Sequence, residues 1–174
     1  MKTILTEQQL SITIQRLANQ LLENHLELSN TVLIGIQPRG IHLSDRIVKE
    51  ISKQVASQNI HYGKLDITFY RDDVRQGLHT LNKTDIPFSI ENKNVVLIDD
   101  VLYTGRTIRA ALDALLDFGR PSKVELCVLI DRRFSRQLPI QPDYVGKAID
   151  SIISQKVKVF WKEKDEQEEV MLIE

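Results

Sequence analysis

The sequence predicts an α/β fold, in which an open, mainly parallel twisted sheet has helices on both faces and a small C-terminal lobe is added. Short apolar, β-branched runs alternate with segments whose apolar residues recur at helical spacing, which is typical of a parallel sheet covered by helices. The C-terminal part changes to strands that alternate between polar and apolar residues. The 174 residues, 42% of them hydrophobic and 27% charged, favour one domain, 1–174, with a sizeable core.

The first part of the chain predicts helix, strand, helix and strand. These elements are a helix from Leu10 to Leu21, a strand over Thr31–Ile36 buried on both faces, a helix from Ile41 to Val55 and a strand through Leu65, Ile67 and Phe69. Thr6 and Gln9 have the spacing of a capping box, which indicates where the first helix begins.

The middle of the chain continues the alternation after a long polar stretch. Residues 71–92 show no sustained periodicity, and a connection of that length is usually functional or disordered. Asn94–Ile98 then predicts the most apolar strand, Ile108–Leu116 a helix and Val124–Ile130 another buried strand. The single cysteine, Cys127, lies within the last of these runs, so we expect a core residue rather than a nucleophile.

Residues 132–174 are expected to supply much of the small lobe. Lys156–Trp161 alternates between polar and apolar residues, and Glu169–Ile173 could pair with it across a charged turn.

The charge balance argues against a general polyanion binder. Lys and Arg total 23 and Asp and Glu total 24, for a formal net charge of -1, so a nucleic-acid partner would need a local basic patch. The first residues lack the apolar core of a signal peptide, and nowhere do about 18 apolar residues run together. We therefore expect a cytoplasmic protein without a membrane partner.

The chemistry is concentrated where the Asn94–Ile98 strand ends. Asp99 and Asp100 follow it directly, at the edge where open α/β sheets bind ligands. Thr104, Gly105 and Thr107 come next and open a helix, so hydroxyls and free backbone N–H groups lie at its positive end and can hold a phosphate. Carboxylates would repel that phosphate, so they should face sugar hydroxyls or a cation. An acidic pair alone would more often be a helix cap, but together with this loop it indicates a sugar phosphate as ligand.

Val95–Thr107 resembles the 5-phosphoribosyl-1-diphosphate (PRPP) motif of type I phosphoribosyltransferases. The similarity extends over nearly the whole chain, and is closest to family members that also regulate pyrimidine operons. The segments that carry it are Gly35–Gly40, Tyr70–Asp73, Val95–Thr107, Gly119–Ser122, Leu138–Ile140 and Asp143–Lys147.

This resemblance implies a PRPP site and the residues that form it. The implied PRPP-binding residues are Arg39, Gly40, Asp99, Asp100, Val101, Leu102, Tyr103, Thr104, Gly105, Arg106 and Thr107. Asp99 and Asp100 would bind the ribose hydroxyls and, with Arg39 and Arg71, form the catalytic set. Arg106 could equally face solvent. The segment after Asp73 corresponds to a loop that closes over PRPP and could add Arg75 against the diphosphate.

The resemblance also implies the reaction. Uracil and PRPP would give UMP and diphosphate, with the uracil pocket near Arg132 and Val157 beneath a C-terminal hood lobe. Mg²⁺ would be the cofactor, held mainly by PRPP and not directly by the protein. Two alternatives stay open at this point: an RNA-binding attenuation regulator with little catalysis, and a purine phosphoribosyltransferase.

RNA of a pyrimidine operon is the second implied partner, and the protein would be a homodimer or a higher homo-oligomer. Arg16, Arg136 and Lys147 could contribute to a basic patch, although solvated charges are the simpler interpretation. Gln15, Asn19 and Gln141 depart from the pattern of the RNA-binding members. Gln37-Pro38 also replaces the usual Lys-Thr, and permits a cis peptide bond.

Overall fold

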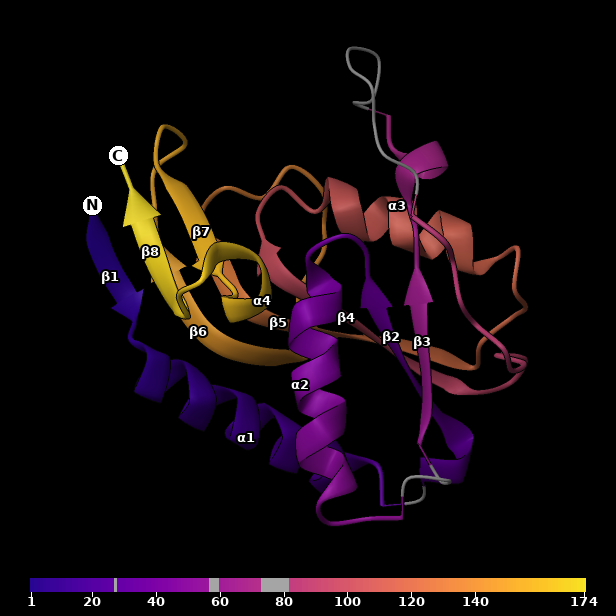
Figure 1. Ribbon diagram of the computed structural model, residues 1–174. Helices are drawn as coiled ribbons and strands as arrows, with labels where there is room; N and C mark the ends of the chain where they lie inside the picture. Colours follow the sequence, from indigo (N-terminus) through magenta and orange to yellow (C-terminus); the bar gives the residue numbers. More distant parts are fainter. Residues whose placement is uncertain (27, 57–59, 73–81) are drawn as a thin grey trace.

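The computed structural model describes residues 1–174 except 27, 57–59 and 73–81. In this part of the chain, five parallel strands form the main sheet in the order β3-β2-β4-β5-β6 (Figure 1). They are β2 (Thr31–Ile36), β3 (His61–Leu65), β4 (Asn94–Leu102), β5 (Lys123–Arg133) and β6 (Tyr144–Asp150). The order places β4, with the acidic pair, at the centre of the sheet, so the parallel α/β fold that the sequence predicts is confirmed.

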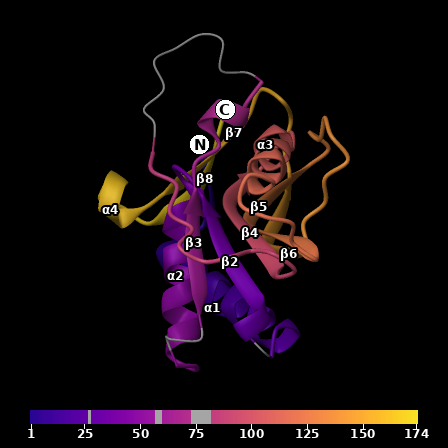
Figure 2. The same cartoon turned by 90° about the vertical axis from the view of Figure 1, so that its right-hand side faces the viewer.

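Helices cover both faces of the main sheet. Helices α1 (Glu7–Asn24) and α2 (Gly40–Ser52) lie on one face, and α3 (Arg106–Leu115) lies on the other, as Figure 2 shows. Alternate residues of a strand point to opposite faces, so Leu33 of β2 packs with α1 and α2 whereas Ile34 packs with α3. All six residues of β2 are buried. The capping box of Thr6 and Gln9 begins α1 as the sequence predicts.

A separate three-stranded antiparallel sheet forms the hood. Its strands are β1 (Lys2–Leu5), β7 (Lys156–Phe160) and β8 (Glu169–Ile173), in the spatial order β1-β8-β7. The short helix α4 (Lys162–Asp165) lies between β7 and β8 in the sequence. The predicted pairing of β7 with β8 is confirmed. Strand β1 was not predicted from the sequence; it pairs with β8 and brings the two termini side by side (Figure 1).

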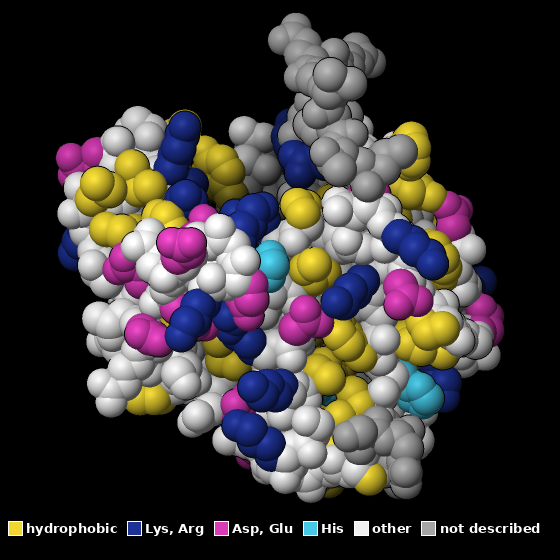
Figure 3. Space-filling model, in the orientation of Figure 1, with side chains coloured by type: hydrophobic (Ala, Val, Ile, Leu, Met, Phe, Trp, Pro, Cys, Tyr) yellow, Lys and Arg dark blue, Asp and Glu magenta, His cyan; other side chains and the backbone are white. Residues whose placement is uncertain are grey.

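Arg46 connects α2 to the hood. Its guanidinium contacts Glu163 and Glu168 of the hood side, each at 2.9 Å, and lies 4.5 Å from the centre of the Trp161 ring. A groove of about 630 Å³ runs along this junction. On the face in Figure 3 basic and acidic side chains are interspersed, without a large area of one sign.

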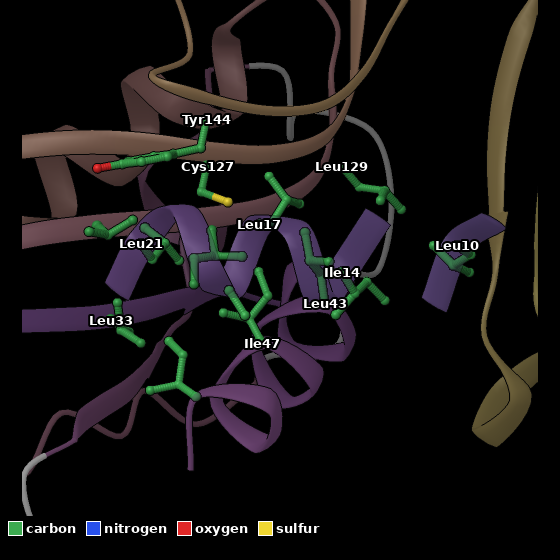
Figure 4. Packing of buried hydrophobic residues seen from close by; sticks show 14 of the residues in the cluster. Leu10, Ile14, Leu17, Leu21, Leu33, Leu43, Ile47, Cys127, Leu129 and Tyr144 are labelled. Carbon is green, nitrogen blue, oxygen red and sulfur yellow. The ribbon is translucent and has the colours of Figure 1, made fainter. Parts of the chain in front are cut away.

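The larger core lies between the sheet and the helices α1 and α2. Figure 4 shows side chains of α1 and α2, such as Leu17 and Ile47, lying against side chains of the sheet, such as Leu33 and Cys127. Cys127 is fully buried among them, and burial raises its pKa to about 12, so this thiol stays protonated as expected for a core residue.

One predicted strand is wrong in position. The alternation of Leu65, Ile67 and Phe69 indicated a strand there, but β3 ends at Leu65, and Thr68–Tyr70 forms a short 3₁₀ helix, η3. The Asp66 side chain causes the turn, because its Oδ1 accepts hydrogen bonds from the Thr68 N–H at 3.0 Å and the Thr68 hydroxyl at 2.6 Å. Phe69 is consequently 81% exposed.

Candidate functional site

The loop between β4 and α3 forms a concave pocket at the carboxyl edge of the sheet. Gly105, at a φ of 92°, immediately precedes α3, and the Thr104 hydroxyl accepts a hydrogen bond from the Arg106 N–H at 3.4 Å. The lining residues enclose about 230 Å³ and are Arg71, Asp99, Val101, Leu102, Tyr103, Thr104, Gly105, Arg106, Thr107 and Ile108. The loop and the first turn of α3 therefore bring backbone N–H groups and hydroxyls to one small cavity, an arrangement that suits a phosphate.

The acidic pair is buried and its two carboxylates have different surroundings. Asp99 and Asp100 are each 6% exposed, and adjacent strand residues point to opposite faces. Asp99 lines the 230 Å³ cavity, and its Oδ1 accepts a hydrogen bond from the Asp100 N–H at 2.9 Å. Asp100 instead accepts from the Arg39 Nε at 3.1 Å.

Burial raises the pKa of both carboxyl groups. For Asp99 the neighbouring Asp100 charge raises the pKa further, and the more distant Arg71 and Arg39 only partly oppose this. Burial also raises the pKa of Asp100, and the charge and hydrogen bond of the Arg39 guanidinium are the main effects that oppose this rise. Ionisation of this pair therefore leaves a poorly solvated negative charge, which hydroxyl donors or a cation would stabilise.

Arg39 connects the acidic pair to the hood. Besides Asp100, its guanidinium donates to the backbone carbonyl of Val159 in β7. Gly40, the first residue of α2, packs against β4 so closely that an added Cβ would lie 2.5 Å from the Ile98 carbonyl oxygen and 3.0 Å from the Asp99 Cα. Gly40 thus lets this loop contact the strand that carries the carboxylates. The peptide bond Gln37-Pro38 before it is cis.

Two more arginines border this cavity. Arg71 donates to the Thr107 hydroxyl at 3.3 Å. Arg106 is held by the Asp72 carboxylate at 2.8 Å and by the Gln137 side-chain oxygen at 2.9 Å. Arg75 of the predicted closing loop lies outside the described residues.

The predicted base-binding residues are in different settings. Arg132, at the end of β5, is 4% exposed, and its guanidinium stacks 3.9 Å from the centre of the Tyr103 ring. The same group donates to the loop that joins β6 to β7, residues 151–155. That loop borders a second cavity of about 570 Å³. Val157 lies in β7, partly buried against the larger core.

The three predicted RNA contacts do not form one group. Arg16 on α1 donates to the backbone carbonyls of Val145 and Gly146 in β6, and the Lys147 ammonium donates to the Ile4 carbonyl at 3.0 Å. Arg136 lies beside the phosphate loop instead, where it donates to the Tyr103 carbonyl at 2.7 Å and pairs with Asp131 at 2.6 Å. Arg16 therefore contacts the strand in which Lys147 lies, whereas Arg136 lies beside the phosphate loop.

Some contacts at the site were not predicted. The sequence placed Asp72 in a family-like segment but gave no reason to expect that it would pair with Arg106 and Arg109, at 2.8 and 3.3 Å. The Val159 carbonyl could not be predicted, because every residue has one and only the fold brings this one to Arg39.

In the described part of the chain, no group of three or more His, Cys, Asp or Glu side chains could hold a metal ion. None of the described helices has the length and apolar character that a membrane span requires.

Comparisons with known proteins agree on one family. Residues 1–164 match the model of the phosphoribosyl transferase domain. A bifunctional protein PyrR from Picosynechococcus sp. is 48% identical over 171 residues, which are 98% of this chain and 96% of that protein. One from Elusimicrobium minutum is 46% identical over 175 residues, covering 99% and 96%.

Solved structures show the same fold at low identity. A hypoxanthine phosphoribosyltransferase from Staphylococcus aureus superposes with a TM-score of 0.73 at 22% identity, covering 100% of this chain and 91% of that one. A variant of the Trypanosoma cruzi hypoxanthine phosphoribosyltransferase gives a TM-score of 0.77 at 17% identity, with coverage of 100% and 95%.

Proposed function

The chain belongs to the phosphoribosyltransferase family, among the relatives of the bifunctional PyrR proteins, and from this premise we propose that it converts uracil and PRPP to UMP and diphosphate. One observation carries the proposal: the cavity at the start of α3, the buried acidic pair and Arg39 meet at the carboxyl edge of β4. A sugar that bears a phosphate at one end and a diphosphate at the other has matching groups for all three.

The 5-phosphate of PRPP belongs in the cavity at the start of α3. Backbone N–H groups of residues 104–107 and the hydroxyls of Thr104 and Thr107 can donate to its oxygens, and the positive end of the ten-residue helix favours its charge. Arg71, which contacts Thr107 at 3.3 Å, supplies a cation nearby. These groups hold the part of the substrate that does not react, and so fix the position of the reacting carbon.

The acidic pair and Arg39 act at the reacting end. Asp99 and Asp100 accept hydrogen bonds from the ribose hydroxyls, which compensates their buried charge. Arg39 and the bare backbone at Gly40 bind the diphosphate. The bond from C1 to the diphosphate oxygen breaks with its electron pair leaving on that oxygen, while uracil N1 forms the new bond to C1 and releases its proton to water. Catalysis is then positioning and stabilisation of the leaving charge.

Mg²⁺ suits this site as a partner of the substrate. The described residues offer a pair of carboxylates but no cage of ligands, and this ion is commonly bound by one or two carboxylates together with substrate phosphates. Bound with PRPP, the ion would supply positive charge to offset the charge that develops on the leaving diphosphate.

The base site is proposed at Arg132 and Val157, beneath the hood. The loop of residues 151–155, to which Arg132 is bound, brings backbone donors and acceptors close to the phosphate loop through the contact of Arg132 with Tyr103. Such backbone groups suit the alternating donors and acceptors of a pyrimidine edge.

A second function, regulation of pyrimidine operon transcription through mRNA, is favoured by the relatives, which are named bifunctional. Arg16, which contacts β6, and Lys147, which lies in β6, are the residues we propose for this contact, with UMP as the ligand that links it to the enzyme. We propose a homodimer or higher homo-oligomer for this form.

One assay distinguishes the functions. The purified chain is incubated with PRPP, Mg²⁺ and each of uracil, hypoxanthine and guanine, and diphosphate release is measured. We expect turnover with uracil alone. Turnover with a purine would establish the alternative substrate class, and a folded chain without turnover on any base would leave only the regulatory function.

A further inference from the structure

Arg132 is a buried cation without a carboxylate partner among the described residues. It is 4% exposed, and its hydrogen bonds all go to uncharged oxygens: the Ser151 hydroxyl at 2.8 Å and the carbonyls of Ile152 and Gln155 at 3.1 and 2.9 Å. Burial lowers the pKa of this guanidinium. Something must therefore compensate a charge that has been removed from water.

The Tyr103 ring adds to the compensation that these hydrogen bonds provide. Its centre lies 3.9 Å from the guanidinium carbon, a distance at which a cation over an aromatic face is attracted by the ring quadrupole. A tyrosine ring is also a flat, rigid surface that limits how the planar guanidinium can rotate.

The pair lies between two cavities. Tyr103 lines the 230 Å³ cavity at the phosphate loop, whereas the three partners of Arg132 lie in the loop 151–155, which borders the 570 Å³ cavity. The two cavities share no lining residue, so this pair is a direct physical connection between them.

We propose that Tyr103 is a positioning residue for base binding: its ring holds Arg132, and Arg132 holds the loop 151–155 in the shape that the base requires. The expected effect on the KM for uracil rests on the proposed function, whereas the expected effect on the loop 151–155 does not. It assigns the Tyr103 side chain to the base rather than to PRPP, although the Tyr103 backbone belongs to the PRPP motif.

Two variants distinguish the contribution of the Tyr103 ring from that of its hydroxyl. Tyr103→Phe keeps the aromatic face, whereas Tyr103→Leu removes it, and both leave the backbone carbonyl that accepts from Arg136. In Tyr103→Leu we expect the KM for uracil to rise about three- to tenfold, as loss of a partly buried cation–aromatic contact implies, with less than about a twofold change for PRPP. Tyr103→Phe, which keeps the aromatic face, should raise the KM for uracil less than Tyr103→Leu does.

Hydrogen exchange provides a readout that needs no turnover. Amides of residues 151–156 should exchange faster in Tyr103→Leu and at the original rate in Tyr103→Phe, while amides of α1 serve as the control for global stability. Unchanged exchange in the loop, or equal rises of both KM values, would overturn the inference. If the unmodified chain does not use uracil, the proposed function fails, but the exchange experiment still decides whether Tyr103 positions this loop.

Discussion

Asp99 combines a functional requirement with a penalty for stability. It is 6% exposed and carries no ion pair in the described structure, so its charge is poorly solvated. Because burial raises its pKa in the folded state, folding is opposed at every pH at which the unfolded chain would ionise this group. A substrate hydroxyl would relieve the penalty only when it is bound.

We predict that Asp99→Asn stabilises the fold and impairs the enzyme. At neutral pH the free energy of unfolding should rise by about 1.4 kcal/mol for each unit by which the pKa is raised, and kcat/KM should fall about 10²-fold or more because a ribose acceptor is lost. Urea unfolding and initial rates measure the two effects. The exposed α3 carboxylate in Asp113→Asn is the control, for which neither quantity should change much.

The stabilisation by Asp99→Asn should depend on pH with a definite sign. Below the pKa of the unfolded carboxyl, near 4, the original Asp99 is protonated in both states, and the two proteins should be equally stable. The difference grows as the pH rises through the raised folded pKa and is then constant. A difference that is as large at pH 3.5 as at pH 8 would show that the effect is not electrostatic.

At the scale of elements, the junction between α2 and β4 depends on Gly40. Alanine is the better helix former by about 1 kcal/mol, yet its Cβ would lie 2.5 Å from the Ile98 carbonyl oxygen. The packing constraint is backbone against backbone, so it cannot be relieved by rotating a side chain.

Gly40→Ala is therefore expected to be destabilising by about 1–3 kcal/mol, as for other overpacked sites, and to raise the KM for PRPP because α2 moves away from β4. Thermal unfolding and steady-state kinetics measure these changes. Lys49→Ala, an exposed position of the same helix, should be neutral or slightly stabilising. A stabilised Gly40→Ala chain with normal kinetics would contradict the role given to this glycine.

The helices and strands could be predicted where a sequence pattern involves residues that are neighbours along the chain. The capping box fixed the beginning of α1, and the apolar run Thr31–Ile36 coincides with β2. β1 could not be predicted, because it is a four-residue strand that exists only through its pairing with β8. The predicted strand through Phe69 was wrong because the side chain of Asp66 turns the chain, a local competition that alternation does not reveal.

At the scale of the whole molecule, the near-neutral charge limits how RNA can bind. With a formal net charge of -1 and interspersed charges on the face in Figure 3, long-range attraction to RNA is weak. Any binding must come from a few local contacts, each of which adds to the salt dependence.

We predict that Lys147→Gln lowers the steepness of salt dependence for a pyrimidine leader transcript. With UMP present, loss of one phosphate contact should reduce the slope of log K against log salt by about 0.7–0.9. Lys53→Gln, at the far end of α2 and paired with Glu50, is the control and should leave the slope unchanged. Equal slopes for Lys147→Gln and the original chain would remove this face from the proposed interface.

The sequence by itself determined the α/β class, the strand that bears the acidic pair and the phosphate loop after it, because each depends on residues that are neighbours along the chain. The tertiary structure decided what joins them: Arg39 to the Val159 carbonyl, Asp72 to Arg106, and Arg132 to Tyr103 and the loop 151–155. These contacts connect residues far apart in the chain, and several involve backbone oxygens that every residue has. Local pattern therefore specifies the chemical groups, and packing specifies which of them meet.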